Sequence, residues 1–328
     1  MSLAPCGSTR GAAPPVAAAL ALLLWLVPAA AAGQPGEARE RAAIAPLASS
    51  SLLLDAAVRD GLVVAVGERG HILVSTDEGR TWRQADVPSR ALLTAVHMHD
   101  TRLGWAVGHD EVVLRTRDGG VTWERVHNAP EKERPLLDVW FADARNGLAV
   151  GAYGSLIATR DGGDTWARGV VHGEDDFHLN QIAAAADGTL FLAGEAGRLF
   201  RSGDKGATWQ PLPSPYQGSF FGLLSRTDGS LLAFGLRGHL FRSPDGGRSW
   251  TPIATGTEET LTCALELGAG RFVVGGMGGT LLWSDEAGIA VRKEDRPDRK
   301  AIVAIVPGGP GTLLLVGEGG VRRVDIPR

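Results

Sequence analysis

The sequence of 328 residues contains 33 lysines and arginines against 37 aspartates and glutamates, so its formal net charge is −4 at pH 7. This weak negative charge argues against nucleic acid and anionic membrane surfaces as partners, because both attract basic proteins. The 45 glycines argue against a helical architecture, since each glycine costs about 1 kcal/mol in a helix interior.

A secretory signal peptide is predicted over residues 1–32. Arg10 is the only charged residue before Glu37, and an apolar run at 16–27 is followed by four alanines at 29–32. These features are typical of a cleavable signal, and the run is short for a membrane span, which needs about 20 residues. Cleavage near Ala32 predicts export to the periplasm or the extracellular space, with retention as an N-terminal anchor as the alternative. Residues 33–43 predict a flexible lead-in.

An internal repeat of about 42 residues organises the rest of the chain. The phrase [Ser/Thr]-x-Asp-x-Gly-x-[Thr/Ser]-Trp occurs five times, with tryptophans spaced 41, 43, 43 and 41 residues apart. Its aspartates are Asp77, Asp118, Asp161, Asp204 and Asp245, and its tryptophans are Trp82, Trp123, Trp166, Trp209 and Trp250. An altered sixth copy keeps Ser284, Glu286 and Gly288. A second phrase, which ends in glycine, recurs seven times and predicts seven units.

Each unit predicts four short strands. The first strands are expected at about 53–58, 92–97, 136–141, 180–185, 220–225, 261–266 and 301–306. Glycine pairs such as Gly67 and Gly70 predict a tight hairpin between the second and third strands, with positive φ at the glycines. The Asp phrase predicts the next turn, and its tryptophan opens the fourth strand. The fold class is therefore all-β, a seven-bladed β-propeller of four-stranded blades.

The predicted propeller spans residues 44–328. Its blades lie at about 51–90, 91–134, 135–178, 179–218, 219–259, 260–299 and 300–328. The last unit has only three predicted strands. We expect the stretch 42–50 to complete this blade as an N-terminal strand beside 321–326, which would close the ring and remove its open edges.

The five Asp phrases match the Asp-box, or BNR, repeat of sialidases, related glycoside hydrolases and other propellers. The whole unit resembles the photosystem II stability/assembly factor family over about residues 50–320. The segment 137–166 carries this resemblance, with Asp138-Val139-Trp140-Phe141, Asn146-Gly147-Leu148 and the phrase from Thr159 to Trp166. The resemblance implies a non-catalytic factor that binds a newly made membrane protein through arginines. In this sequence the arginines are scattered.

The Asp-box aspartates are predicted to hold turns, because a residue required at every turn is a turn residue. We therefore predict no catalytic residue among them. His97 and His99 alone do not make a metal site, since zinc needs at least a third ligand, and neither a metal nor a cofactor is predicted. Cys263, the single cysteine after residue 32, is expected to be a buried small apolar residue.

Two groups of candidate binding residues follow from the predicted propeller. Alignment of the innermost strands places five polar residues at one position facing the channel, namely Asp55, Thr94, Asp138, Gln181 and Thr262, with Gly222 and Val303 in the other two blades. They either line the channel with bound water or contact a ligand or cation. The loop-rich end offers Arg69, His109, Tyr153, Arg198, Arg237 and Tyr216, which form either a recognition surface or ordinary solvated loops.

Two functions are open on these grounds. The first is an exported non-catalytic scaffold that binds a protein partner, such as a membrane protein or an envelope complex. The alternative is a sialidase-like glycoside hydrolase or a carbohydrate-binding propeller. The chain has two tyrosines, Tyr153 and Tyr216, and lacks the Arg-Ile-Pro segment common in sialidases, which favours the scaffold. A small-molecule or sugar ligand stays open.

Overall fold

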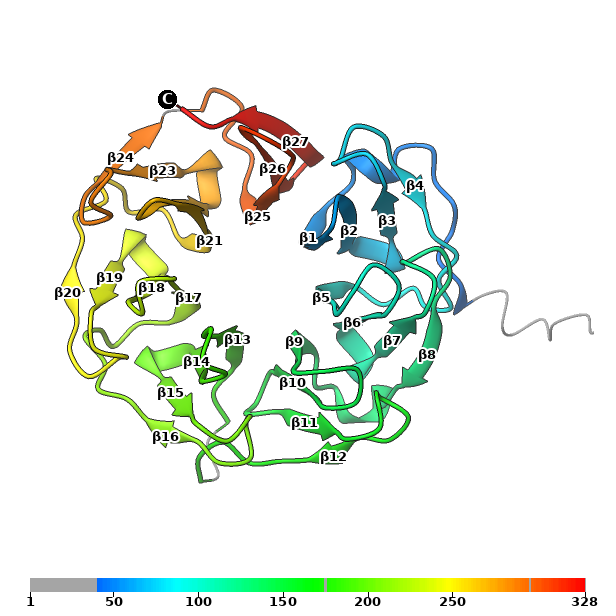
Figure 1. The fold of residues 1–328 in the computed structure, drawn as a ribbon. Helices are drawn as coiled ribbons and strands as arrows, with labels where there is room; N and C mark the ends of the chain where they lie inside the picture. Colours follow the sequence, from blue (N-terminus) through cyan, green and yellow to red (C-terminus); the bar gives the residue numbers. More distant parts are fainter. Residues whose placement is uncertain (1–39, 174–175, 295, 328) are drawn as a thin grey trace, which may run out of the picture.

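The computed structural model describes residues 40–173, 176–294 and 296–327. These residues form seven antiparallel sheets arranged as blades around a central channel (Figure 1). The predicted all-β, seven-bladed propeller is confirmed. No helix in the described ranges is long and apolar enough to cross a bilayer. The predicted signal peptide lies outside these ranges.

The strands of each blade run in sequence order from the channel to the rim. The innermost strands are β1 (Leu53–Arg59), β5 (Leu93–Met98), β9 (Leu136–Phe141), β13 (Leu179–Ala184), β17 (Phe220–Ser225), β21 (Leu261–Gly268) and β25 (Ile302–Pro307). The second strands are β2 (Leu62–Gly67), β6 (Gly104–Gly108), β10 (Gly147–Gly151), β14 (Leu190–Gly194), β18 (Leu231–Gly235), β22 (Arg271–Gly276) and β26 (Thr312–Gly317). The innermost strands begin within one residue of their predicted positions.

The outer strands complete each blade. The third strands are β3 (Ile72–Ser75), β7 (Val113–Thr116), β11 (Leu156–Thr159), β15 (Leu199–Ser202), β19 (Leu240–Ser243), β23 (Leu281–Ser284) and β27 (Gly320–Asp325). The fourth strands are β4 (Arg83–Gln84), β8 (Glu124–His127), β12 (Ala167–Arg168), β16 (Gln210–Pro211), β20 (Thr251–Pro252) and β24 (Val291–Glu294). Short 3₁₀ turns are η1 (Ala48–Ser50), η2 (Glu68–Gly70), η3 (His109–Glu111), η4 (Pro130–Lys132), η5 (Glu195–Gly197), η6 (Leu236–Gly238) and η7 (Met277–Gly279).

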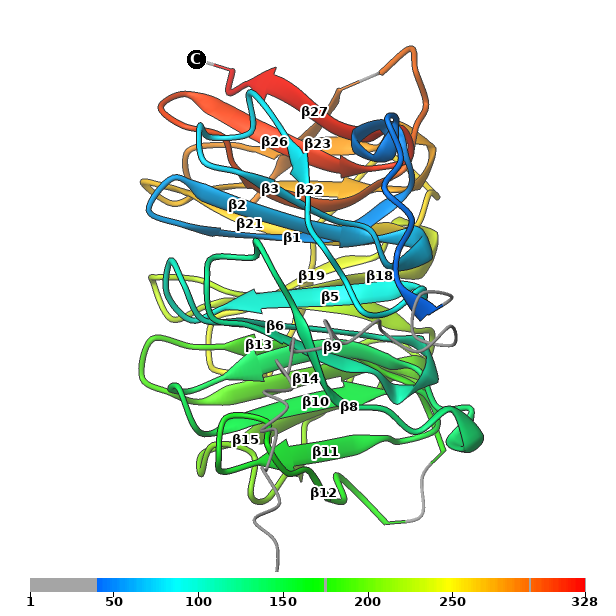
Figure 2. The same cartoon turned by 90° about the vertical axis from the view of Figure 1, so that its right-hand side faces the viewer.

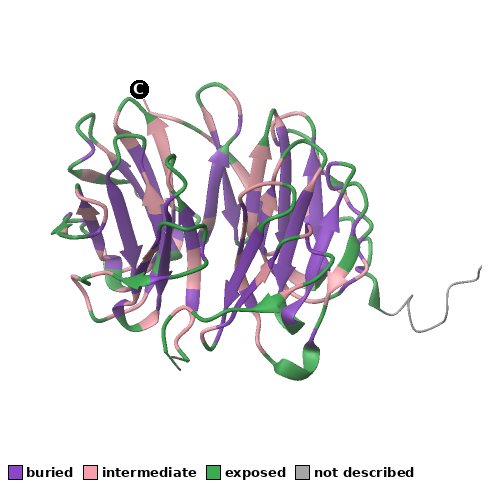
Figure 3. Cartoon of the chain, turned by 60° about the horizontal axis from the view of Figure 1, so that its bottom comes forward, coloured by how far each residue is buried: buried purple, intermediate pink, exposed green. Residues whose placement is uncertain are grey.

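The core lies between neighbouring blades. Every residue of β2, β6, β10, β14 and β18 is buried, and Figure 3 shows the buried colour along the strands with exposed loops at their ends. A strand that is covered on both faces must be apolar at every position, which explains short unbroken runs such as 62–66. These strands therefore fix each blade against both of its neighbours.

The hairpin glycines act in two different ways, and the prediction of positive φ holds for the second of each pair. Gly154 has a φ of 65°, whereas the φ of Gly151 is not positive. A Cβ on Gly151 would lie 2.1 Å from the carbonyl oxygen of Pro135, so this position needs glycine because two backbone segments approach closely. The residue before the second glycine, here Tyr153, is also left-handed, with φ of 55°.

The predicted closing strand was wrong. Six sheets have four strands, but β25, β26 and β27 form a sheet of three among the described residues. The stretch 42–50 instead follows the rim of the first blade, where the Ala45 amide donates to Gln84 Oε1 at 2.9 Å, and Figure 2 shows it in dark blue beside that blade. The Ala42 amide donates to the Val87 carbonyl and Gln84 Nε2 donates to the Ala43 carbonyl, so the main chain of this stretch is bonded to the first blade.

The ring is closed by side chains rather than by a shared sheet. Leu53 of the first blade and Leu314 and Val316 of the last lie in one buried apolar cluster, which Ala48 joins from the N-terminal stretch. The Arg323 guanidinium of the last blade also donates to the Glu78 carbonyl of the first. Burial of apolar surface therefore takes the place of the expected strand pairing.

Candidate functional site

The Asp-box turns are held together by their own carboxylates. In the third blade Thr159 donates its hydroxyl to Asp161 Oδ1 at 2.8 Å and accepts from the Gly163 amide at 2.9 Å. Asp161 accepts from the Thr165 amide at 2.9 Å and from the Thr165 hydroxyl at 2.6 Å. These bonds, those from Thr165 first, lower the pKa of Asp161 to about 2 because they stabilise the ionised form.

The other four Asp-boxes repeat this geometry. Asp77, Asp118, Asp204 and Asp245 each accept from a Ser or Thr hydroxyl on both sides and from a turn amide. A carboxylate with its oxygens engaged in this way supports a turn. In the sixth turn, however, Asp285 accepts from the Ile289 and Ala290 amides. Asp285 therefore holds this turn in place of Glu286, the residue that the repeat had aligned with the other aspartates.

The Asp-box tryptophans precede the fourth strands by one residue and pack between blades. Trp123 and Trp166 donate their indole N–H to the turn carbonyls of Gly120 and Gly163, at 3.1 and 3.2 Å. The Trp250 indole N–H donates to the Pro213 carbonyl. Trp209 is buried, and Trp82 packs against the apolar cluster between the first and last blades. The ten predicted Asp-box side chains therefore lie in turns and blade interfaces.

Replacing Asp204 by alanine is expected to lower the melting temperature by several degrees, because its turn loses the three hydrogen bonds that the carboxylate accepts. Thr208→Ser is the matched control, since Ser249 occupies that position in the fifth blade and makes the same bond at 2.6 Å. Differential scanning calorimetry of both variants tests this. An Asp204→Ala protein that melts with the wild type would contradict the structural role.

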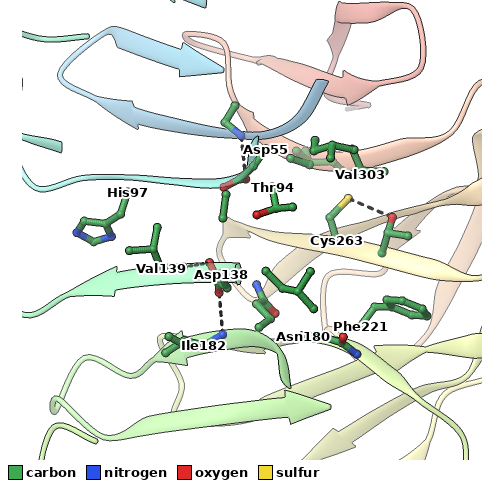
Figure 4. Close-up of a pocket in the computed structure, with 18 of the residues that line it drawn as sticks. Asp55, Thr94, His97, Asp138, Val139, Asn180, Ile182, Phe221, Cys263 and Val303 are labelled. Atoms are coloured by element: carbon green, nitrogen blue, oxygen red, sulfur yellow. Dashed lines mark hydrogen bonds between the residues drawn. The ribbon is translucent and has the colours of Figure 1, made fainter. Parts of the chain in front are cut away.

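The central channel contains a cavity of about 360 Å³, lined by residues of the innermost strands. Figure 4 shows Asp55, Thr94, Asp138, Asn180 and Cys263 around this space, each from a different blade. The cavity therefore brings together side chains that lie far apart in the sequence.

The predicted ring of equivalent polar residues was wrong in register. Each innermost strand has a bulge after its first residue. The bulged residues are Leu54, Thr94, Leu137, Asn180, Phe221, Thr262 and Val303, and the next position holds Asp55, Ala95, Asp138, Gln181, Gly222, Cys263 and Ala304. The five candidates occupy two neighbouring layers, because Thr94 and Thr262 are the bulged residues of their strands, whereas Asp55, Asp138 and Gln181 follow the bulge.

The two channel carboxyl groups each join adjacent blades. Asp55 accepts from its neighbour Ala56 and from Val96 of the next blade, both at 2.8 Å. Asp138 accepts from Val139 and from Ile182 of the next blade, both at 2.7 Å (Figure 4). Burial raises the pKa of each to about 7 against these hydrogen bonds, and the charge of Asp55 adds to the rise at Asp138.

The other three channel candidates make similar bonds. Gln181 Oε1 accepts from the Leu223 amide at 2.7 Å, while the hydroxyls of Thr94 and Thr262 donate to the carbonyls of Leu136 and Ile302. All five polar groups therefore connect an innermost strand to the next blade. This arrangement explains their polarity without a ligand, and their predicted role in binding stays a prediction.

Two further titratable groups of the cavity are held neutral. Burial lowers the pKa of His97 to about 4, with the positive charges of Arg59 and His99 adding to the effect. Burial also raises the pKa of the Cys263 thiol to about 12. Across the described ranges, no group of three His, Cys, Asp or Glu side chains is placed to hold a metal ion.

The two ends of the ring carry different loops. We name the end with the Asp-box turns the Asp-box face, and the end with η2, η3, η5, η6, η7 and the links between blades the connection face. Arg69, Tyr153 and Arg237 occupy the same left-handed position in the turns of their blades, with φ of 57°, 55° and 54°. His109 lies in η3, and Tyr216 stacks on His239 with ring centres 4.0 Å apart. Most candidates of this face are therefore on separate blades.

Tyr153 and Arg198 are the exception, because they line one cavity of about 310 Å³ between the third and fourth blades. We name it the blade 3–4 pocket. The Arg198 guanidinium lies 4.5 Å from the centre of the Phe177 ring, and the Tyr153 ring meets His178 edge-on at 5.1 Å. Arg134 also lines the pocket. The only sign in the sequence that Arg134 belongs to a binding site was its position in a long link between two blades.

Comparison with known proteins shows which proteins this propeller is similar to. A family model described as the photosynthesis system II assembly factor YCF48 matches residues 129–218. The chloroplastic photosystem II stability/assembly factor HCF136 of Cyanidioschyzon merolae is 37% identical over 81 residues, which are 24% of this chain and 17% of that protein. The chain is a propeller similar to the photosystem II assembly factors. The resemblance predicted from its sequence is thereby confirmed.

Solved structures show how far the shared fold of this assembly-factor-like propeller extends. "YCF48 bound to D1 peptide" has a TM-score of 0.72 at 17% identity, over 85% of this chain and 95% of the other. YCF48 from Cyanidioschyzon merolae has a TM-score of 0.70 at 16% identity, over 88% and 98%. An ancestral GH74 enzyme also matches, with a TM-score of 0.68 at 12% identity, over 87% of this chain and 46% of the enzyme. At these identities the likeness concerns the fold.

Proposed function

We propose that this propeller is a non-catalytic scaffold that binds a protein partner at the blade 3–4 pocket. One observation carries the proposal: every residue that lines this pocket, from Arg134 to Phe200, lies within the segment 129–218 that matches the assembly-factor family. A solved YCF48 structure has a D1 peptide bound. A peptide is therefore the class of ligand that the resemblance favours.

The chemistry of the pocket suits a polypeptide. Tyr153 and Val170 are 50% and 69% exposed, so they offer apolar surface to a partner. Arg134 and Arg198 add two guanidinium groups at the same cavity. Exposed aromatic side chains beside arginines are typical of the residues that contribute most to protein interfaces.

The place of action that we propose is outside the cytoplasm, on a membrane or envelope complex. The support is the signal peptide predicted over residues 1–32 and the family resemblance. Within this proposal, the scaffold would hold a partner during its assembly. Such a role needs a rigid binding surface and no chemical step.

The alternative of a glycoside hydrolase is less well supported. The shared fold with an ancestral GH74 enzyme covers 46% of that enzyme, and a glycosidase needs two carboxyl groups with free access to a sugar. The five Asp-box carboxylates are engaged in turns. Asp55 and Asp138 are engaged with main-chain amides of two blades.

Affinity purification of the tagged full chain from its own cell envelope, followed by mass spectrometry, tests the proposal. We expect an envelope protein to be enriched with the wild type and lost with Tyr153→Ala combined with Arg198→Ala. Alanine is compatible with the left-handed turn, because Ala196 holds the equivalent position with φ of 50°. Arg237→Ala is the control, since it alters the same turn position on another blade.

Two results would contradict this function. The first is recovery of the same proteins by wild type and double variant, which would leave the pocket without a role. The second is turnover of aryl glycosides by the purified chain, which would support the alternative enzyme.

A further inference from the structure

Among the described residues, the last blade has an open edge at the rim of the propeller. Figure 1 shows β27 as the outermost strand of its blade, whereas the other six blades each have one more strand further out. The third strands of those six blades are almost completely buried, but in β27 Arg323 and Asp325 are exposed and Val321 and Val324 are half-buried. This edge is therefore accessible.

The main chain of this edge is oriented for strand pairing. In the first blade Ile72 accepts from the Ala85 amide beyond the end of β4, and Val74 pairs with Arg83. Val321 and Arg323 hold the equivalent positions, because Val321 pairs with Val316 as Ile72 pairs with Val66. Since alternate residues of a strand point their amide and carbonyl to the same side, the main-chain groups of Val321 and Arg323 face outward.

The stretch expected to cover this edge is held elsewhere. The Ala42 amide donates to the Val87 carbonyl at 3.0 Å, and Glu40 pairs with Arg125 of the second blade at 2.8 Å. The described N-terminal residues reach only the start of β27, where the Ser49 carbonyl lies close to Gly320 and Val321 shares an apolar cluster with Ala48. Among the described residues, no main-chain hydrogen bond joins this stretch to Val321 or Arg323.

The charge on the edge favours a partner over a second copy. Arg322 pairs with Asp298 at 2.6 Å, but Arg323 donates only to the carbonyls of Glu78 and Gly308 in the described part of the chain. Two copies paired along the whole of Val321–Asp325 would place Arg323 opposite its own equivalent, and like charges directly opposite are destabilising. A strand with an acidic side chain at that position complements the edge.

We propose that the open edge of β27 takes up an extended segment of the protein partner as the fourth strand of the seventh blade, with an acidic side chain opposite Arg323. Strand addition to an exposed edge is an established mode of peptide recognition, in which main-chain hydrogen bonds supply the affinity. The inference rests on the proposed function, since the partner supplies the strand. It adds a second contact, on a different blade from the blade 3–4 pocket.

Hydrogen exchange of the full chain alone tests whether the edge is free. We expect the Arg323 amide to exchange at least a hundredfold faster than the equivalent Val74 amide. Protection of Arg323 that is independent of protein concentration would mean that residues of the same chain cover the edge. Protection that rises with concentration would mean a second copy. Either result overturns the proposal.

A peptide selection tests what the edge binds. Random twelve-residue peptides displayed on phage are selected on the full chain, and the affinity of the selected peptides is measured by fluorescence anisotropy. We expect acidic, strand-forming peptides, at least tenfold weaker binding to Arg323→Pro, and a smaller loss with Arg323→Ala, which keeps the amide. Proline removes an outward donor and is tolerated on edge strands.

The exchange experiment is repeated on the wild-type chain with a selected peptide bound, and the Arg323 amide must then become protected. This result does not depend on whether the Arg323→Pro variant folds. An unprotected amide, undiminished binding to Arg323→Pro, or failure to select acidic peptides overturns the inference. If the edge fails while co-purification still depends on Tyr153 and Arg198, the proposed function stands and only the strand addition is wrong.

Discussion

Gly151→Ala is expected to lower the free energy of unfolding by about 3 kcal/mol, at the upper end of the usual cost of overpacking. The added methyl carbon would lie 2.1 Å from the Pro135 carbonyl oxygen and 2.8 Å from the Leu136 Cα. Both are main-chain atoms, so no side-chain rotation relieves the clash. The strand pairing of β9 with β10 must open instead. Urea denaturation followed by tryptophan fluorescence measures the loss.

Gly203→Ala is the control for this prediction. Gly203 lies in a turn without positive φ, and the nearest atom to an added Cβ is a guanidinium nitrogen of Arg201 at 3.9 Å. We expect a change within about 0.5 kcal/mol, as for other surface substitutions. Equal stability of the two alanine variants would contradict the close backbone approach at Gly151.

Raising the pH from 6.5 to 8.5 is expected to lower the free energy of unfolding by about 1.5 kcal/mol through Asp55 and Asp138 together. Their pKa values of about 7 in the fold lie above the ordinary value of 3.8. The folded chain therefore keeps protons that the unfolded chain has already lost. A raised pKa gives stability that is fully present below the unfolded pKa and is lost as the pH rises through 7.

A histidine effect of opposite sign is small in this pH window. His97 has a lowered pKa of about 4, so most of the stability that it adds is gained as the pH rises toward its ordinary value of 6.5, and only about 0.4 kcal/mol is gained between pH 6.5 and 8.5. Thermal melts across the window measure the slope. We expect the fall in stability to disappear in the double variant Asp55→Asn, Asp138→Asn, because neither amide titrates.

Asp143→Asn is the matched control for the channel pair. Hydrogen bonds from Asn146 and Arg145 lower the pKa of Asp143, so it is ionised in both states throughout the window. This variant should keep the wild-type slope. A wild-type stability that does not change from pH 6.5 to 8.5 would contradict the raised pKa of the channel carboxyl groups.

Much of the blade could be predicted because its signals are local. Asp161 is bonded to residues within four positions of itself, so the repeated phrase already contains the whole turn. The alternation of apolar runs and glycine turns likewise placed the innermost strands within one residue. Repetition then gave seven blades, since each copy must bury the same two faces.

The candidate sites were harder to predict, because they depend on neighbouring blades. Thr94 is the bulged residue of its strand and Asp138 follows the bulge of its own, so the two lie in different layers of the channel although the repeat spacing had aligned them. The blade 3–4 pocket joins Tyr153 to Arg198 across a blade boundary. Sequence reasoning found both residues but not their meeting, and it missed Arg134 and Phe177.

The sequence by itself determined the repeat, the hairpins and the number of blades, because turn chemistry and apolar patterning act over a few residues. Only the tertiary structure decided how the ring closes, which carboxyl groups share the channel and where an edge stays open. These features depend on contacts between segments that are distant in the sequence, such as the bond between Glu78 and Arg323, which are 245 residues apart. The contacts of the stretch 42–50 with Gln84 and Val87 of the first blade are of the same kind, because no local pattern specifies them.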